Sequence, residues 1–317
     1  MAITKVFFAT DVHGSERVFM KFLNVRLVHE VDVMVLGGDI TGKLVVPLVR
    51  GPDGSYKTQF LGGQWTAKNE EELAQLEKNI RYNGFYPYRT NPEEAKGLQA
   101  DKAKVDELFS KLMVETLKKW IGIAEERLKK TGIKCYISPG NDDRFVIDEV
   151  LDGSDYIINP EGRVVSISDK YEMISCGFTN PTPWNTAREC SEEELASKIE
   201  AQASQVKNME NCIFNFHAPP YNSSLDTAAK LDPTLKPVFI GGHPQMIPVG
   251  STAVRDAINK YQPLLGLHGH VHESKRVSKM GRTVCLNPGS DYQEGLLRGT
   301  LVMLGDNKVL DYLQISG

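Results

Sequence analysis

Short apolar runs that stop at a glycine or a polar residue recur through the first and last thirds of the chain. Runs of this kind, bounded by turn residues, are typical of strands buried on both faces of a sheet. We read as strands residues 5–10, 33–36, 135–138, 212–216 and 263–267. Later segments suggest antiparallel pairs, namely residues 166–176, 281–287 and 300–315, the last with a turn at Gly305-Asp306-Asn307-Lys308. The pattern predicts a mixed, layered α/β architecture.

The stretch between residues 43 and 97 follows a different pattern. Two short arms flank Gly51-Pro52-Asp53-Gly54, which predicts a hairpin with a tight turn, and residues 69–81 read as a charged helix. Another helix should start at Asn91-Pro92, and apolar residues spaced three or four apart continue its buried face to Leu128. We expect one domain over residues 1–317, with a hairpin-plus-helix cap inserted at about 43–97.

Charge, apolar run length and cysteine spacing exclude several classes of protein. The formal net charge is −4 and no basic stripe is visible, so a nucleic-acid partner is not expected. No apolar run approaches the ~20 residues of a membrane helix, and the run at residues 6–9 is too short for an export signal. The five cysteines form no C-x-x-C pair, which argues against a disulfide framework or a thiolate zinc site. A cytoplasmic protein is the simplest expectation.

Five polar clusters each follow a predicted strand, and together they carry the chemistry. They are Asp11-Val12-His13, Gly37-Gly38-Asp39, Gly140-Asn141-Asp142-Asp143, Phe216-His217-Ala218 and Gly269-His270-Val271-His272. Carboxylate and imidazole without thiolate suit Mn, Fe, Zn, Ni or similar divalent ions. Side chains two residues apart on an extended strand end lie on the same side. If two ions are to lie about 3.5–4 Å apart, one carboxylate must bridge them.

The ordered series D-x-H, G-D, G-N-x-D, H and G-H-x-H, from Asp11 to His272, resembles the calcineurin-like metallophosphoesterase family. The resemblance implies two mixed β-sheets packed as a sandwich and flanked by helices. It implies two metal ions, the first held by Asp11, His13, Asp39 and His272, and the second by Asn141, His217 and His270, with Asp39 shared. It also implies phosphate-ester hydrolysis by a metal-bridging hydroxide that attacks phosphorus in line, with manganese among the candidate ions.

One position departs from the family pattern. Most members have G-N-H-D or G-N-H-E, and that histidine is thought to protonate the leaving group, whereas this chain has Asp142 there. Asp142 could serve as the acid if neighbouring negative charges raise its pKa. Alternatively, it only hydrogen-bonds a loop. The sequence leaves both roles open.

Substrate contacts are harder to predict than ligands. We name Tyr221, which follows His217 in a proline-rich segment, His243 in a Gly/Pro-rich loop, and Arg255 near an apparent helix start. The rigid loop Asn180-Pro181-Thr182-Pro183-Trp184 could line a pocket or merely pack. The insertion could cover the site or join two copies into a homo-oligomer.

Two classes of function compete at this stage. The first is a metal-dependent phosphoesterase acting on a small phosphorylated substrate, with a phosphodiesterase favoured over a monoesterase or a nuclease. The second is a metal-binding interaction module with the same fold and little or no catalysis. All seven ligand positions carry competent residues, which favours bound metal.

Overall fold

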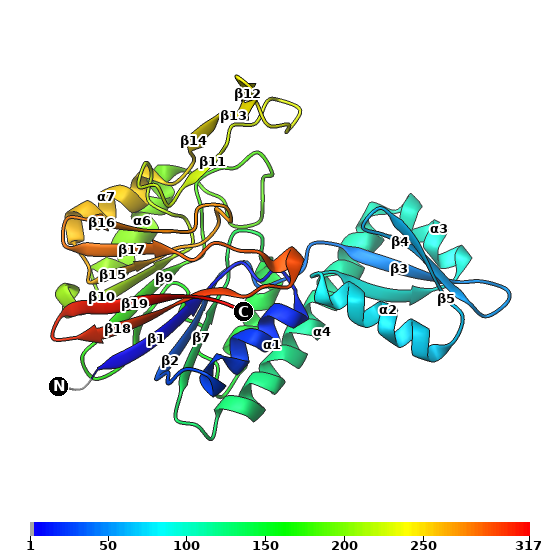
Figure 1. The fold of residues 1–317 in the computed structure, drawn as a ribbon, viewed down its shortest axis with the longest axis horizontal. Helices are drawn as coiled ribbons and strands as arrows, with labels where there is room; N and C mark the ends of the chain where they lie inside the picture. Colours follow the sequence, from blue (N-terminus) through cyan, green and yellow to red (C-terminus); the bar gives the residue numbers. More distant parts are fainter. Residues whose placement is uncertain (1–2) are drawn as a thin grey trace.

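Two β-sheets pack face to face in the computed structural model, which describes residues 3–317 (Figure 1). The first sheet has the order β19-β18-β1-β2-β7, with β1 (Thr4–Ala9), β2 (Val33–Gly37), β7 (Lys134–Ser138), β18 (Arg298–Gly305) and β19 (Lys308–Ser316). The second has the order β16-β17-β15-β10-β9-β8, with β8 (Val164–Ser166), β9 (Glu172–Cys176), β10 (Cys212–Phe216), β15 (Leu265–Leu267), β16 (Arg276–Met280) and β17 (Thr283–Asn287). Both sheets mix parallel and antiparallel pairs.

Helices cover the outer face of each sheet. Helices α1 (Glu16–Asn24), α4 (Lys102–Leu128) and α5 (Asp148–Asp152) pack on the first sheet, and α6 (Glu192–Ala203) and α7 (Thr252–Tyr261) pack on the second. A third apolar cluster, which includes Phe8, Met173 and Leu265, fills the space between the sheets. This four-layer arrangement confirms the expected α/β sandwich. Short 3₁₀ turns complete it: η1 (Val25–Leu27), η2 (Phe145–Ile147), η3 (Met209–Asn211) and η4 (Tyr292–Glu294).

Residues 45–100 form a separate layer beside the sandwich, at the right of Figure 1. Its sheet has the order β5-β4-β3-β6, built from β3 (Val45–Arg50), β4 (Tyr56–Phe60), β5 (Gly63–Ala67) and β6 (Tyr86–Thr90), and it carries α2 (Glu70–Tyr82) and α3 (Pro92–Ala100). The predicted hairpin is present as β3 and β4. The segment contains more than a hairpin and a helix, because β5 extends the hairpin and β6 pairs in parallel with β3. An apolar cluster including Leu48, Leu73 and Ile80 gives this layer its own core.

The long predicted helix is in fact two helices. Helix α3 ends at Ala100, and Asp101 then accepts hydrogen bonds from the backbone N–H groups of Ala103 and Lys104 as the N-cap of α4. The prediction missed this break because the apolar spacing continues across it, while the cap depends on one carboxylate. Helix α4 reaches from the insertion to the sandwich, where Trp120 stacks on Phe19 at 4.2 Å between ring centroids.

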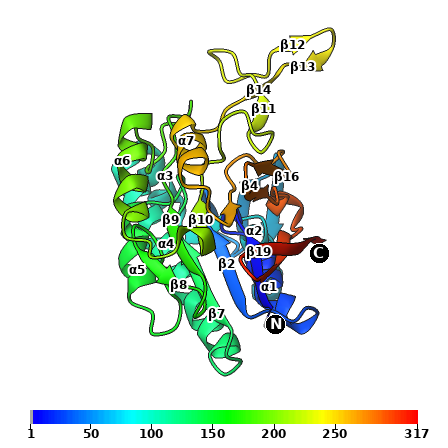
Figure 2. The ribbon, with the colours of Figure 1, turned by 90° about the vertical axis from the view of Figure 1, so that its left-hand side faces the viewer.

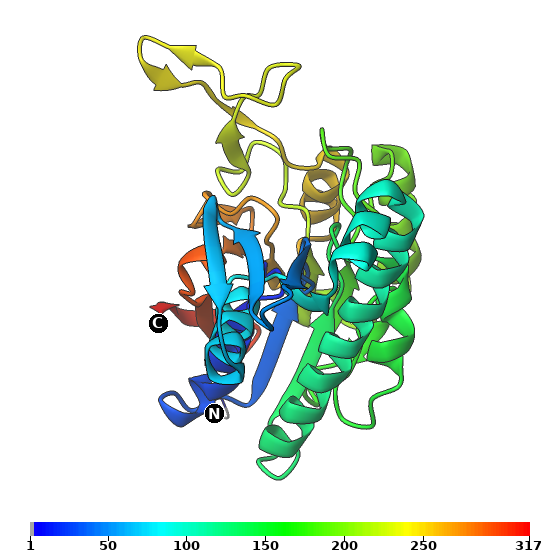
Figure 3. The same ribbon diagram turned by 90° about the vertical axis from the view of Figure 1, so that its right-hand side faces the viewer.

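A ribbon of chain, which we call the arm (residues 226–248), rises above the sandwich (Figures 2 and 3). It contains β11 (Thr227–Ala229), β12 (Phe239–Ile240), β13 (His243–Pro244) and β14 (Met246–Pro248), which pair only within the arm. From residue 227 onward none of its side chains is buried. None of the helices in residues 3–317 has the length and hydropathy needed to cross a membrane.

Candidate metal centre

Strand direction brings the five polar clusters together. Strands β1, β2 and β7 run parallel in one sheet, and β10 and β15 run parallel in the other. Their carboxyl ends therefore lie at one edge of each sheet, where the following loops meet. The side chains that converge there are those of Asp11, His13, Asp39, Asn141, His217, His270 and His272. The structure thus places every predicted metal ligand in one cluster.

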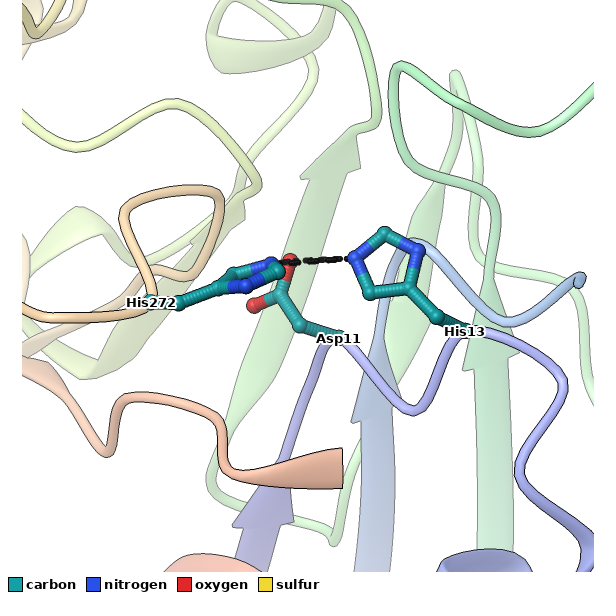
Figure 4. A group of neighbouring side chains, drawn as sticks. All are labelled: Asp11, His13 and His272. Carbon is teal, nitrogen blue, oxygen red and sulfur yellow. Dashed lines mark hydrogen bonds and ion pairs between the residues drawn. The ribbon is translucent and has the colours of Figure 1, made fainter. Parts of the chain in front are cut away.

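The first group within this cluster contains Asp11, His13 and His272 (Figure 4). The two imidazoles approach with their Nε2 atoms 3.0 Å apart, and His272 Nε2 lies 3.5 Å from Asp11 Oδ1. Asp11 and His13 are both 1% exposed. Three donor atoms of this kind, turned toward one point, form a suitable set for one divalent ion.

The second group contains Asp11, Asp39 and His217. His217 Nε2 lies 3.4 Å from Asp39 Oδ1 and 3.8 Å from Asp11 Oδ1. The other oxygen of Asp39, Oδ2, lies 3.6 Å from His13 Nε2. The two oxygens of one carboxylate therefore face two different imidazoles, which is the arrangement that a shared ligand requires.

Asn141 and His270 complete the cluster on the side of the second group. Asn141 Oδ1 lies 2.8 Å from His270 Nδ1, and its Nδ2 donates to Thr186 Oγ1 at 2.8 Å. The bond to Thr186 fixes which end of the amide faces the cluster, and that end is the oxygen. Asn141 can thus offer a neutral oxygen ligand without adding negative charge.

Four of the seven side chains sit on backbone in the left-handed region. The φ angles are 54° at Asp11, 41° at His13, 51° at Asp39 and 67° at His270. Non-glycine residues rarely adopt this conformation, which costs roughly 1–3 kcal/mol each and concentrates at functional sites. The surrounding structure therefore holds these residues in place against a local preference.

Glycines let the loops approach one another closely. Gly38 has φ +108°, and a Cβ there would lie 2.5 Å from His217 Nδ1. A Cβ on Gly140 would lie 2.3 Å from Asp39 Oδ1. Any side chain at these two positions would push apart the residues of the second group.

Buried opposite charges shift the pKa values of the cluster. Burial disfavours the charged form of Asp11, but the hydrogen bond with His272 and the field of His217 outweigh it and lower its pKa to about 2. Burial likewise opposes protonation of His217, yet the carboxylates of Asp39 and Asp11 raise its pKa to about 10. Burial lowers the pKa of His270 to about 4. Without other cations, a proton on His217 compensates the buried carboxylates.

One ring nitrogen of His217 lacks a hydrogen-bond partner. His217 Nδ1 lies 3.0 Å from the Gly37 carbonyl oxygen, which turns Nε2 toward Asp11 and Asp39. Nε2 is buried and makes no hydrogen bond in the described structure. An imidazole fixed through one nitrogen, with the other free and facing carboxylates, is the usual arrangement of a metal ligand. The donor set therefore fits a divalent ion.

The two aspartates after Asn141 have different surroundings. Asp143 is fully buried and accepts hydrogen bonds from the backbone N–H groups of Ile40, Thr41 and Gly140, so it holds two of the loops together. Asp142 instead faces the cavity beside the cluster, and its Oδ2 lies 2.9 Å from Lys43 Nζ. Burial and the field of Asp39 raise the pKa of Asp142, while Lys43 acts in the opposite direction.

Five residues of the cluster line a cavity of about 720 Å³, and we call the cluster its inner wall: His13, Asp39, Asn141, His270 and His272. We call a second set of lining residues the outer wall, and it consists of Lys43, Phe109, Arg144, Trp184, Asn185 and Thr186. Sequence reasoning missed Lys43, Phe109 and Arg144. The available signals were weak: Lys43 follows Asp39 by four residues, and Arg144 follows directly after Gly140-Asn141-Asp142-Asp143. Tyr292, whose ring lies 4.7 Å from that of His13, was also missed.

Three predicted substrate contacts lie outside the residues that line this cavity. His243 is exposed on β13 in the arm. Tyr221 and Arg255 contact each other instead, with the guanidinium 5.5 Å from the ring centroid. Substrate contact at these three positions therefore stays a prediction that this cavity does not support. His268 is buried, and its Nδ1 lies 2.8 Å from the Phe216 carbonyl oxygen, so its role is structural.

No protein-family model matches this chain. Among curated proteins, the uncharacterized protein MJ1162 of Methanocaldococcus jannaschii is 33% identical over 153 residues, which cover 47% of this chain and 61% of that protein. The chain thus spans less than two thirds of that relative's length.

Solved structures agree on the fold. One crystal structure aligns over 100% of this chain and 99% of its own, with a TM-score of 0.58 and 16% identity. The protein TT1561 of Thermus thermophilus aligns over 100% and 99%, with a TM-score of 0.52 and 14% identity. A looser match is Yfce, a phosphoesterase from E. coli, with a TM-score of 0.31, 12% identity and 98% of each chain covered. The first two structures show that this chain shares its fold with known structures. Its clustered Asp and His side chains are compatible with divalent metal binding.

Proposed function

We propose that this protein is a dinuclear-metal-dependent phosphodiesterase. The observation that carries the proposal is the single cluster of seven oxygen and nitrogen ligands at the strand ends: Asp11, His13, Asp39, Asn141, His217, His270 and His272. Two divalent ions bound there would neutralise phosphate charge and supply an activated water at neutral pH. Asp39 is suited to the shared position because its two oxygens face His13 and His217 separately.

The charges of the outer wall favour a diester over a monoester. Among the described residues that line the cavity, the basic side chains of lysine and arginine are Lys43 and Arg144. Each already forms an ion pair with an acidic side chain. Lys43 pairs with Asp142 at 2.9 Å, and Arg144 pairs with Asp106 at 2.6 Å. Little cationic charge remains for the second negative charge of a monoester dianion, whereas a diester carries only one.

Asp142 and Lys43 are placed to handle the proton of the leaving group. Asp142 Oδ2 lies 3.7 Å from His13 Nδ1 and 2.9 Å from Lys43 Nζ, at the border between the cluster and the open cavity. A departing oxygen on the cavity side of a phosphate bound at the cluster would meet this pair. We propose that this pair supplies the proton there, in the role that a histidine has in the resembled family.

Metal analysis combined with hydrolysis assays tests the proposal. Bis-nitrophenyl and mono-nitrophenyl phosphate would be compared in the presence of Mn, Ni, Zn and Fe. About two ions per chain with faster cleavage of the diester is the expected result. Bound metal without turnover of either ester would favour the interaction module with the same fold. A chain that takes up no metal after reconstitution would falsify the proposal.

A further inference from the structure

One side chain of the outer wall is exposed without a partner. Trp184 is 62% exposed and lines the cavity that contains the metal cluster. Its ring belongs to none of the apolar clusters among residues 3–317 and makes no aromatic contact there. Single exposed apolar residues are common on proteins, so a function for this one must be argued from its position beside the cluster and from the order of its loop.

The loop that carries Trp184 is braced from within. Glu189 accepts hydrogen bonds from the backbone N–H groups of Thr182 and Thr186 at 2.8 Å each, and from both threonine hydroxyls. Thr186 also receives the hydrogen bond from Asn141. The loop is therefore tied to a metal-ligand candidate, and the backbone that carries Trp184 is held beside the cluster. A large aromatic side chain on a braced backbone loses little freedom when it binds a ligand.

A second flat group lines the same cavity. The guanidinium of Arg144 lies 4.6 Å from the ring centroid of Phe109, and its terminal nitrogens are held by Asp106 and Ser110. Guanidinium planes and indole rings are the two surfaces on which planar aromatic groups, including nucleobases, stack. Thr186 and Asn185 add polar atoms to the lining. A cavity of about 720 Å³ has room for a nucleoside and a phosphate.

We infer that the outer wall is a binding subsite for a planar aromatic group, such as a nucleobase, attached to the phosphate ester, with Trp184 as its main contact. The inference rests on the proposed phosphodiesterase function, because it places the phosphate on the inner wall. Trp184 therefore determines which diesters the enzyme prefers, while the inner wall determines that a diester is cleaved.

The test compares diesters that share one leaving group. Methyl, phenyl and thymidine 5′-(p-nitrophenyl) phosphates release the same nitrophenolate and differ only in the retained group. Wild-type protein loaded with Mn is expected to show kcat/KM at least about tenfold higher for the thymidine ester than for the methyl ester. Equal kcat/KM values for the phenyl and thymidine esters would show that the subsite accepts any aryl group. A lower kcat/KM for the phenyl ester would show that the subsite selects a nucleobase.

Substitutions then assign the preference to one ring. Trp184→Ala is expected to lower kcat/KM about tenfold on the thymidine ester and about threefold or less on the methyl ester. Trp184→Phe should restore most of the preference because a flat ring remains. Trp65→Ala is the matched control, since Trp65 is 47% exposed on β5, away from the cavity lining, and this variant should keep the wild-type ratio.

The failure of the subsite can be told apart from the failure of the proposed function. Equal losses on both esters in Trp184→Ala, or no preference in the wild type, would overturn the subsite while hydrolysis stands. If the metal-loaded wild type cleaves none of the esters, the proposed function fails, and tryptophan fluorescence decides about the subsite. Quenching by thymidine 5′-monophosphate in the wild type, but not in Trp184→Phe, would support it. Absence of quenching would overturn it.

Discussion

The inner and outer walls of the cavity are built in opposite ways. The inner wall takes its side chains from strand ends of both sheets, and its aspartates are buried and held on strained backbone, as at Asp11 and Asp39. The outer wall takes its side chains from loops and from helix α4, and they are half-buried or exposed, as at Phe109 and Trp184. The sandwich thus supplies a fixed site for the phosphate, and the loops supply the surface that selects what is attached to it.

The largest expected effect comes from removing an inner-wall imidazole. His217→Ala should lower kcat/KM on bis-nitrophenyl phosphate by on the order of 10³-fold, and should reduce bound metal from about two ions to about one. Metal content by mass spectrometry and hydrolysis rates would be measured together. His29→Ala, in a turn outside the cavity lining, is the control. Full metal occupancy with full activity in His217→Ala would contradict the role of His217 as a metal ligand of the inner wall.

An intermediate effect is expected at the border between the walls. Asp142→Asn should lower turnover of diesters with alkyl leaving groups by about 10- to 100-fold, and turnover of nitrophenyl esters much less, because nitrophenolate needs no proton to leave. Lys43→Met removes the cation that lowers the pKa of Asp142 from 2.9 Å away, so it should change the same ratio less than Asp142→Asn does. Equal losses on good and poor leaving groups would assign Asp142 to loop structure alone.

The pH dependence of metal binding tests the charge state of the inner wall. His217 has a pKa of about 10 in the metal-free protein, above its ordinary 6.5, and an ion must displace its proton. Apparent affinity for Mn should therefore rise by up to about tenfold per pH unit between pH 6.5 and 10. Calorimetry in buffers of different ionisation enthalpy should show about one proton released from His217 per chain near pH 8. An affinity independent of pH across this window would contradict the protonated state of His217.

Stability of the metal-free protein should change in the opposite sense. A histidine whose pKa is raised by folding stabilises the folded state fully below its unfolded value, and this contribution is lost as pH rises through the folded value. The His217 contribution to the free energy of unfolding should thus be complete below pH 6.5 and absent above about 10. Urea unfolding of the metal-free wild type and of His217→Ala, compared across this range, would measure the difference.

The smallest effect is expected within the outer wall. Glu189→Ala removes the acceptor that holds Thr182 and Thr186, so the Trp184 loop should loosen. KM for the thymidine ester should rise roughly three- to tenfold with little change in kcat, since positioning and not chemistry is lost. Glu194→Ala, at an exposed site on α6, is the control. A large fall in kcat on every ester would show that the loop also positions Asn141.

The sequence predicted the inner wall because its chemistry follows from strand order. Parallel strands end at one edge of a sheet, so Asp11, Asp39 and His217 could be placed together without knowing any side-chain contact. Lys43 and Arg144 could not be placed, because their positions depend on pairing with Asp142 and Asp106 across the fold. The break at Asp101 was hidden for a similar reason, since one capping carboxylate overrides a continuous apolar pattern.

The arm lies between two ligand segments and is tied to one of them only at its base, where the Thr227 backbone N–H donates to Ser274 Oγ and that hydroxyl donates to the Thr227 carbonyl, each at 2.8 Å. His217 follows β10 and His270 follows β15, and these strands are direct neighbours that align Asn215 with Leu267. The distance between the two histidines is therefore set by the sheet and not by the arm of residues 226–248. We expect insertions or a proteolytic nick in the exposed ribbon beyond residue 229 to leave the spacing of these two histidines unchanged. Length changes in that part of the arm should therefore leave metal content unchanged.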